Sequence, residues 1–166
     1  MKSIVEQFAI QGYVTDVQPL GTGLINDTYK VDMDAGVGYV LQRINHAIFK
    51  DVVLLQNNIE AVTAHIRAKL EAAGEEDVDR KVLKFIPLKE SAQTWWFDGA
   101  SYWRVSVLIA DSITIDTVNP EYSYYAGKAF GNFQSMLSDI NETLGETIPD
   151  FHNMELRARQ LEEAMA

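Results

Sequence analysis

The chain has 166 residues, of which 47% are hydrophobic and 23% are charged, and its formal net charge is −10 at pH 7. These values are typical of a soluble globular protein of about one domain. The acidic balance argues against nucleic-acid and anionic-membrane partners, which need a basic face, and the lack of cysteine excludes disulfides and thiolate metal sites. No apolar run approaches 18 residues and no signal-peptide pattern opens the sequence, so we expect a cytoplasmic protein.

The N-terminal part predicts a short helix and then two strands joined by a glycine turn. Ser3 and Glu6 have capping-box spacing, so the helix should run to about residue 11 and stop at Gly12. Alternating apolar residues predict strands over 13–17 and 28–32. Gly21 and Gly23 lie between them, and glycine lets backbone N–H groups approach a phosphate closely. An ordinary hairpin would explain the same residues.

A third strand and a long helix follow. Residues 39–44 form an apolar run interrupted by Gln42 and Arg43, and Arg43 can also be explained as an edge residue with its head group in water. Asp51 is a suitable N-cap for a helix ending near residue 73, with Gly74 as its stop. Glu60 lies beside the apolar face of this helix, which comprises Ile59, Val62, Ile66 and Leu70. By itself Glu60 would be interpreted as a solvated carboxylate.

The remaining sequence predicts a second group of strands and then helices. Residues 81–86 are predicted as a strand, and residues 95–97 and 102–109 as a hairpin with Asp98-Gly99 in its loop. A polar connector covers 110–117, and helical spacing over 122–137 and from 155 onward predicts two helices. This order predicts an α+β fold: an antiparallel sheet with one long helix, followed by the first helices of a helical region.

Four segments resemble the N-terminal part of the N-acetylhexosamine 1-kinases, which belong to the aminoglycoside phosphotransferase and choline kinase superfamily with its protein-kinase-like fold. They are Gly21-Thr22-Gly23-Leu24-Ile25-Asn26-Asp27-Thr28-Tyr29, Tyr39-Val40-Leu41-Gln42-Arg43-Ile44-Asn45, Asn57-Asn58-Ile59-Glu60-Ala61-Val62-Thr63 and Ile148-Pro149-Asp150-Phe151-His152-Asn153. The resemblance covers essentially the whole chain. It implies a nucleotide-binding N-terminal lobe over 1–110, then a hinge and the start of a helical C-terminal lobe over 111–166.

The resemblance also implies roles in binding ATP. The glycine turn, with Gly21, Thr22 and Gly23, would cover the phosphates, and Asn26 beside it would reach phosphate or sugar, although hairpin capping explains Asn26 equally well. The strand cation Arg43 would contact the α- and β-phosphates and pair with Glu60. The family has lysine at this position, and a register shift of one residue would put Gln42 there instead. Backbone groups from Ile109 to Asp111 would face the adenine.

The catalytic motifs of this family are absent from the sequence. A kinase of this kind needs a His-x-Asp loop for the base and an Asp-x-Asp-like motif for Mg²⁺, and none of His46, His65 and His152 has aspartate two positions later. We therefore expect no catalytic or metal-ligating residue in this chain. It would be the N-terminal part of a parent kinase that uses ATP and Mg²⁺ to phosphorylate an N-acetylhexosamine, and would itself be inactive.

One further expectation concerns the last helix, and two alternatives to the sugar-kinase interpretation remain open. The last helix would leave Leu161 and Met165 without partners, which favours self-association through that surface. The parent could instead be a kinase of the same superfamily that acts on choline, homoserine or an aminoglycoside. The second alternative is a non-catalytic module that binds a nucleotide or a partner.

Overall fold

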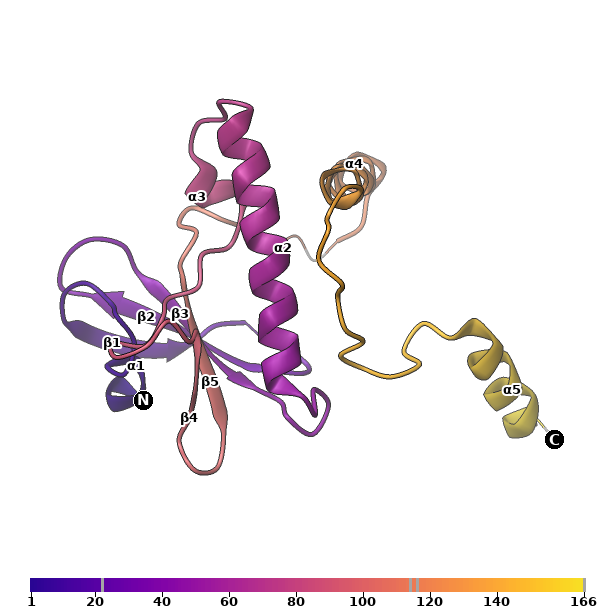
Figure 1. The fold of residues 1–166 in the computed structure, drawn as a ribbon, viewed down its shortest axis with the longest axis horizontal. Helices are drawn as coiled ribbons and strands as arrows, with labels where there is room; N and C mark the ends of the chain where they lie inside the picture. Colours follow the sequence, from indigo (N-terminus) through magenta and orange to yellow (C-terminus); the bar gives the residue numbers. More distant parts are fainter. Residues whose placement is uncertain (22, 114, 116, 166) are drawn as a thin grey trace.

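The structure, a computed structural model, describes residues 1–21, 23–113, 115 and 117–165. It has a mixed α+β fold built on a five-stranded antiparallel sheet (Figure 1). The strands are β1 (Val14–Pro19), β2 (Asp27–Met33), β3 (Tyr39–Ile44), β4 (Trp95–Phe97) and β5 (Tyr102–Val107). Their spatial order is β1-β2-β3-β5-β4. The antiparallel sheet and the α+β class agree with the prediction from the sequence.

The register of β3 against β5 determines which side chains share a face of the sheet. Gln42 lies opposite Arg104, and Leu41 lies opposite Val105. Side chains directly opposite one another project from the same face, and successive residues project from opposite faces. Gln42 and Arg104 therefore lie on one face, and Leu41 and Val105 lie on the other together with Arg43.

Each face of the sheet is covered by a different part of the chain. The first face is the one from which Leu41 and Val105 project. Both residues are fully buried there and pack with Val5 and Phe8 from the N-terminal segment, which covers this face. Ile44, at the end of β3, packs on the second face with residues at the start of α2 (Val52–Ala72), namely Val52 and Leu55. Figure 1 shows the long helix α2 alongside the sheet. The second face is thus the one shared by Gln42, Arg104 and α2.

The ends of α2 follow from local sequence signals. The Asp51 carboxylate accepts a hydrogen bond from the Leu54 N–H at 2.8 Å, which satisfies a backbone donor in the first turn. The helix ends at Ala72, and Gly74 has φ 69°, a conformation that glycine adopts without strain. The predicted N-cap and the predicted stop residue are both confirmed.

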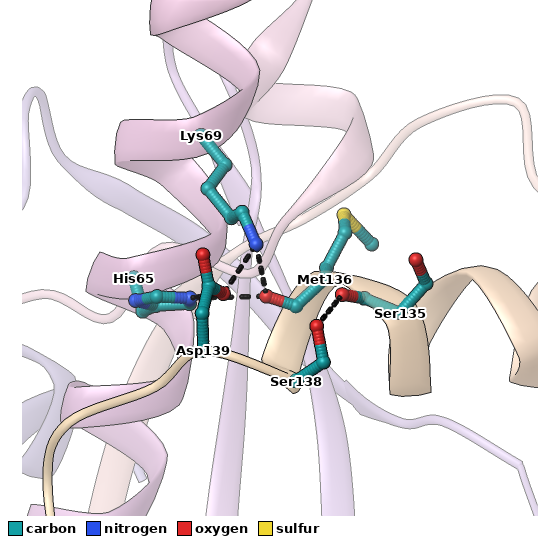
Figure 2. A network of polar contacts seen from close by, with 6 residues as sticks. All are labelled: His65, Lys69, Ser135, Met136, Ser138 and Asp139. Carbon is teal, nitrogen blue, oxygen red and sulfur yellow. Dashed lines mark hydrogen bonds and ion pairs between the residues drawn. The ribbon is translucent and has the colours of Figure 1, made fainter.

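The first helix after the sheet lies against α2. It is α4 (Pro120–Leu137), and the Asn119 side chain caps it by accepting from the Tyr122 N–H at 2.8 Å. Figure 2 shows the contact: the Met136 carbonyl accepts from Lys69 Nζ at 2.9 Å, and Asp139 pairs with both Lys69 and His65 of α2. Polar groups therefore join α4 to α2.

A loop and a last helix follow α4. The Asn58 side chain on α2 exchanges two hydrogen bonds with the Gly145 backbone, at 2.7 Å and 3.0 Å. The chain then leads to α5 (Met154–Met165), which Figure 1 shows apart from the sheet. Leu161 and Met165 on α5 are exposed. The self-association expected from these residues stays a prediction.

The predicted strand over 81–86 is wrong. A short helix, α3 (Val78–Lys81), lies at its start, and the following residues make only a brief pairing with β5. The Val107 N–H donates to the Lys84 carbonyl at 2.9 Å, and the Ile86 N–H donates to the Val105 carbonyl at 2.8 Å. β3 pairs with one edge of β5, and β4 pairs with residues 102–104 of the other edge. Only residues 105–107 of that second edge are therefore free to pair with this segment.

The predicted first helix is also too long. Helix α1 covers only Lys2–Val5, and its N-cap is Met1 rather than Ser3. The chain then leaves helical geometry because Phe8 is buried in the core and the Ala9 N–H donates to the Pro87 carbonyl at 2.8 Å. Gly12 has φ 84°, which turns the chain toward β1.

Candidate functional site

A groove of about 380 Å³ lies on the second face of the sheet, and we call it the sheet groove. Its walls come from the end of β1, the middle of β3 and β5, the segment after α3 and the connector that follows β5. The apolar part of its wall comprises Leu20, Val40, Leu83, Phe85, Val107, Leu108 and Ile109. Its polar part comprises Gln42, Arg104, Ser106 and Ser112. A mostly apolar groove with a few polar groups is typical of a small-molecule site.

A chain of side-chain hydrogen bonds extends from the polar part of the groove to α2. Arg104 donates from Nε to the Gln42 side-chain oxygen at 2.9 Å and from Nη1 to the Gln56 oxygen at 3.3 Å. The Gln56 amide then donates to the Thr94 hydroxyl at 2.8 Å, and that hydroxyl donates to the Glu60 carboxylate. The chain thus begins at a cation on β5 and ends at a carboxylate on α2.

Arg104 is partly buried in this setting. Its guanidinium lies over the Phe85 ring, 5.3 Å from the ring centroid, in a cation–π arrangement. Burial disfavours the charged form, and it lowers the pKa of Arg104 to about 10. At neutral pH the side chain is still protonated, so the groove contains a positive charge.

The predicted pair between Arg43 and Glu60 is wrong. Arg43 Nε donates to the Asp27 carboxylate on β2 at 2.6 Å, and Glu60 bonds to Thr94 instead. Gln42 lines the sheet groove, whereas Arg43 projects from the opposite face of β3, and which of the two contacts phosphate stays a prediction. In that position Gln42 would bring a neutral amide rather than a cation.

Arg43 lines a second, smaller cavity of about 210 Å³. This cavity also includes Asp27, Ile25 from the glycine-turn segment, and His46 and Ser101. Since Asp27 is bound to Arg43 and half-exposed with it, the charge of this guanidinium is largely compensated.

The glycine turn between β1 and β2 lies beside the sheet groove. Gly21 has φ 74°, a conformation that favours glycine, and Leu20 just before it lines the groove. A side chain at Gly23 would come within 3.3 Å of the Asn26 carbonyl oxygen. The predicted phosphate contact at Thr22 lies outside the described residues.

The Asn26 side chain, whose role the sequence left open, makes a hydrogen bond within the fold. Its side-chain oxygen accepts from the Asn45 N–H at 2.9 Å and so ties the end of the turn to the end of β3. The contact is to the residue after β3 and not within the β1–β2 hairpin, so both explanations given for Asn26 stay predictions.

The connector after β5 contributes to the groove through its first residues. Ile109 lines the groove, and its carbonyl accepts from the Ser112 hydroxyl at 3.2 Å. Asp111 has φ 56° and is exposed, and it is not among the described residues that line the groove. The structure thus brings Ile109 to the groove together with Gln42 but does not place Asp111 in its wall.

Reasoning from the sequence missed Arg104, Gln56 and Thr94. Arg104 had a usable signal, because it is a cation between Trp103 and Val105 in a strand of aromatic and β-branched residues. Gln56 is fully buried on α2, whereas the apolar face predicted for this helix began at Ile59. Thr94 had no signal, since its place beside α2 depends on the path of the chain before β4.

No protein-family model matches the sequence. Within the described part of the chain, no helix has both the length and the apolar character needed to span a bilayer. In that same part, no three histidine or acidic side chains lie close enough together to hold a metal ion.

Proposed function

We propose that this chain is the nucleotide-binding part of a small-molecule kinase that resembles the N-acetylhexosamine 1-kinases. In this proposal residues 1–110 form a protein-kinase-like N-terminal lobe, and residues 111–166 form the hinge and the first helices of a helical lobe. The order of elements supports this division: a glycine turn between the first two strands, a third strand, a long helix, a hairpin and then a connector to helices.

The sheet groove is the observation that carries the proposal. The residue before the glycine turn, the middle of β3 and the connector after β5 are distant in sequence, yet all three line one cavity. Its apolar wall suits a flat purine ring, and backbone groups near Ile109 offer hydrogen bonds to the ring edge. Gln42, Ser106 and Arg104 make the rest of the wall polar, as a sugar and phosphate require.

ATP fits this wall better than Mg²⁺ does. No carboxylate is among the described residues that line the groove, so they offer a hard cation no charged oxygen ligand. In the parent kinase, ATP would supply the phosphoryl group that an N-acetylhexosamine hydroxyl accepts, with Mg²⁺ bound by residues that this sequence lacks. The 166 residues are expected to bind ATP and to transfer no phosphate.

Calorimetric titration of the 166-residue protein with ATP and with adenosine tests the proposal. Both ligands should bind, and Val40→Phe should weaken both because it fills the groove. Val53→Phe is the matched control, since Val53 is exposed on α2 and should leave binding unchanged. Failure of both ligands to bind at millimolar concentration would remove the nucleotide site. Phosphorylation of a sugar by the pure chain would contradict the expected inactivity.

A further inference from the structure

Arg104 differs from the other described residues that line the sheet groove because it alone carries a charge. None of the ion pairs between described residues includes it. Its nitrogens donate to the side-chain oxygens of Gln42 and Gln56, which are neutral. A partly buried cation with neutral partners keeps most of its electrostatic attraction for an anion, because no carboxylate compensates its charge.

The nearest link to a carboxylate is indirect. The hydrogen-bond chain passes through Gln56 and Thr94 before it reaches Glu60, so two neutral side chains separate the carboxylate from the guanidinium. The same chain fixes the guanidinium, because Gln42 and Gln56 hold it from two sides and Phe85 lies beneath it. A fixed guanidinium with an uncompensated charge is well suited to bind phosphate oxygens.

We propose that Arg104 is the phosphate-binding cation of the sheet groove, with Gln42 and Gln56 as the residues that position it. The choice of a nucleotide as the source of the phosphate rests on the proposed function. The anion site itself rests only on the surroundings of Arg104. Arg43 is the competing candidate, and its carboxylate partner Asp27 and its place on the opposite face both argue against it.

Calorimetry with three probes separates these points: inorganic tripolyphosphate, ATP and adenosine. Arg104→Met should weaken binding of ATP and of tripolyphosphate about tenfold or more, which corresponds to about 1.4 kcal/mol, and should leave adenosine binding unchanged. Arg43→Met is the matched substitution at the competing cation and should change neither affinity by more than about twofold.

A second variant avoids the loss of a buried side chain. Gln42→Glu keeps the size of the side chain and gives Arg104 a carboxylate partner, so it should weaken tripolyphosphate and ATP binding while the protein melts no lower than the wild type. If Arg104→Met melts early and cannot be assayed, this variant decides the question alone. Unchanged tripolyphosphate affinity in Gln42→Glu would then overturn the proposal.

The outcomes for the anion site and for the nucleotide site differ. If Arg104→Met and Gln42→Glu both bind ATP as tightly as the wild type does, the inference about Arg104 is wrong and the nucleotide groove stands. If tripolyphosphate binding depends on Arg104 but adenosine does not bind and ATP binds no tighter than tripolyphosphate, the anion site stands and the nucleotide proposal fails. If the wild type binds none of the three probes, or if Arg43→Met alone weakens the anions, the inference is wrong.

Discussion

Replacing Gln56 by alanine tests the hydrogen-bond chain between the sheet and α2. Gln56 is fully buried, although glutamine is usually exposed, and its amide joins Arg104 of β5 to Thr94. The substitution removes one buried methylene and leaves Thr94 and Arg104 without the amide. Together these losses should lower the free energy of unfolding by about 2–4 kcal/mol.

Urea denaturation followed by tryptophan fluorescence measures this change, since Trp103 is buried beneath the sheet and reports its unfolding. Asn57→Ala is the control on the same helix: Asn57 is exposed, and its loss should alter the free energy by no more than about 0.5 kcal/mol. Gln56→Ala should also weaken tripolyphosphate binding, because Arg104 loses one of its two positioning contacts. A change below about 0.5 kcal/mol in Gln56→Ala would show that this chain of contacts does not hold α2 to the sheet.

Two further predictions concern α2 and its contact with α4. Asp51→Ala should cost about 1 kcal/mol in urea denaturation because it removes the N-cap, and Asp51→Asn should recover most of that loss; equal losses in both variants would contradict a capping role. The hydrogen bond from Lys69 holds the pKa of Asp139 below its ordinary 3.8, with a smaller effect from His65. The stabilising effect of the Asp139 carboxylate should therefore be complete above pH 3.8 and lost as the pH falls through the lowered pKa. Asp139→Asn should melt below the wild type at pH 6, and this gap should narrow as the pH falls below 3.8; a gap that stays the same would refute this.

The sequence alone determined those parts of the fold whose cause is local. Asp51 and Gly74 mark the ends of α2 because a cap and a stop act within one turn of the helix. β3 was predicted with the bounds it has, and the helix predicted over 122–137 forms as α4, which begins two residues earlier because Asn119 caps it and Pro120 suits its first turn. The antiparallel sheet and the α+β class follow from the same local patterns taken in order.

Only the tertiary structure decided which side chains meet. Gln42 and Arg43 are neighbours in one strand, and their sequence does not say which of them faces α2; the pairing of β3 with β5 does, because a shift of one residue exchanges the faces. The same pairing brings Arg104 into the groove beside Gln42, 62 residues away along the chain. Residues 84–86 likewise have the composition of a strand, but β4 already occupies part of the edge that they would need. Local sequence thus determines where elements begin and end, whereas the cation of the groove and its partners depend on long-range register, which no short stretch of the chain contains.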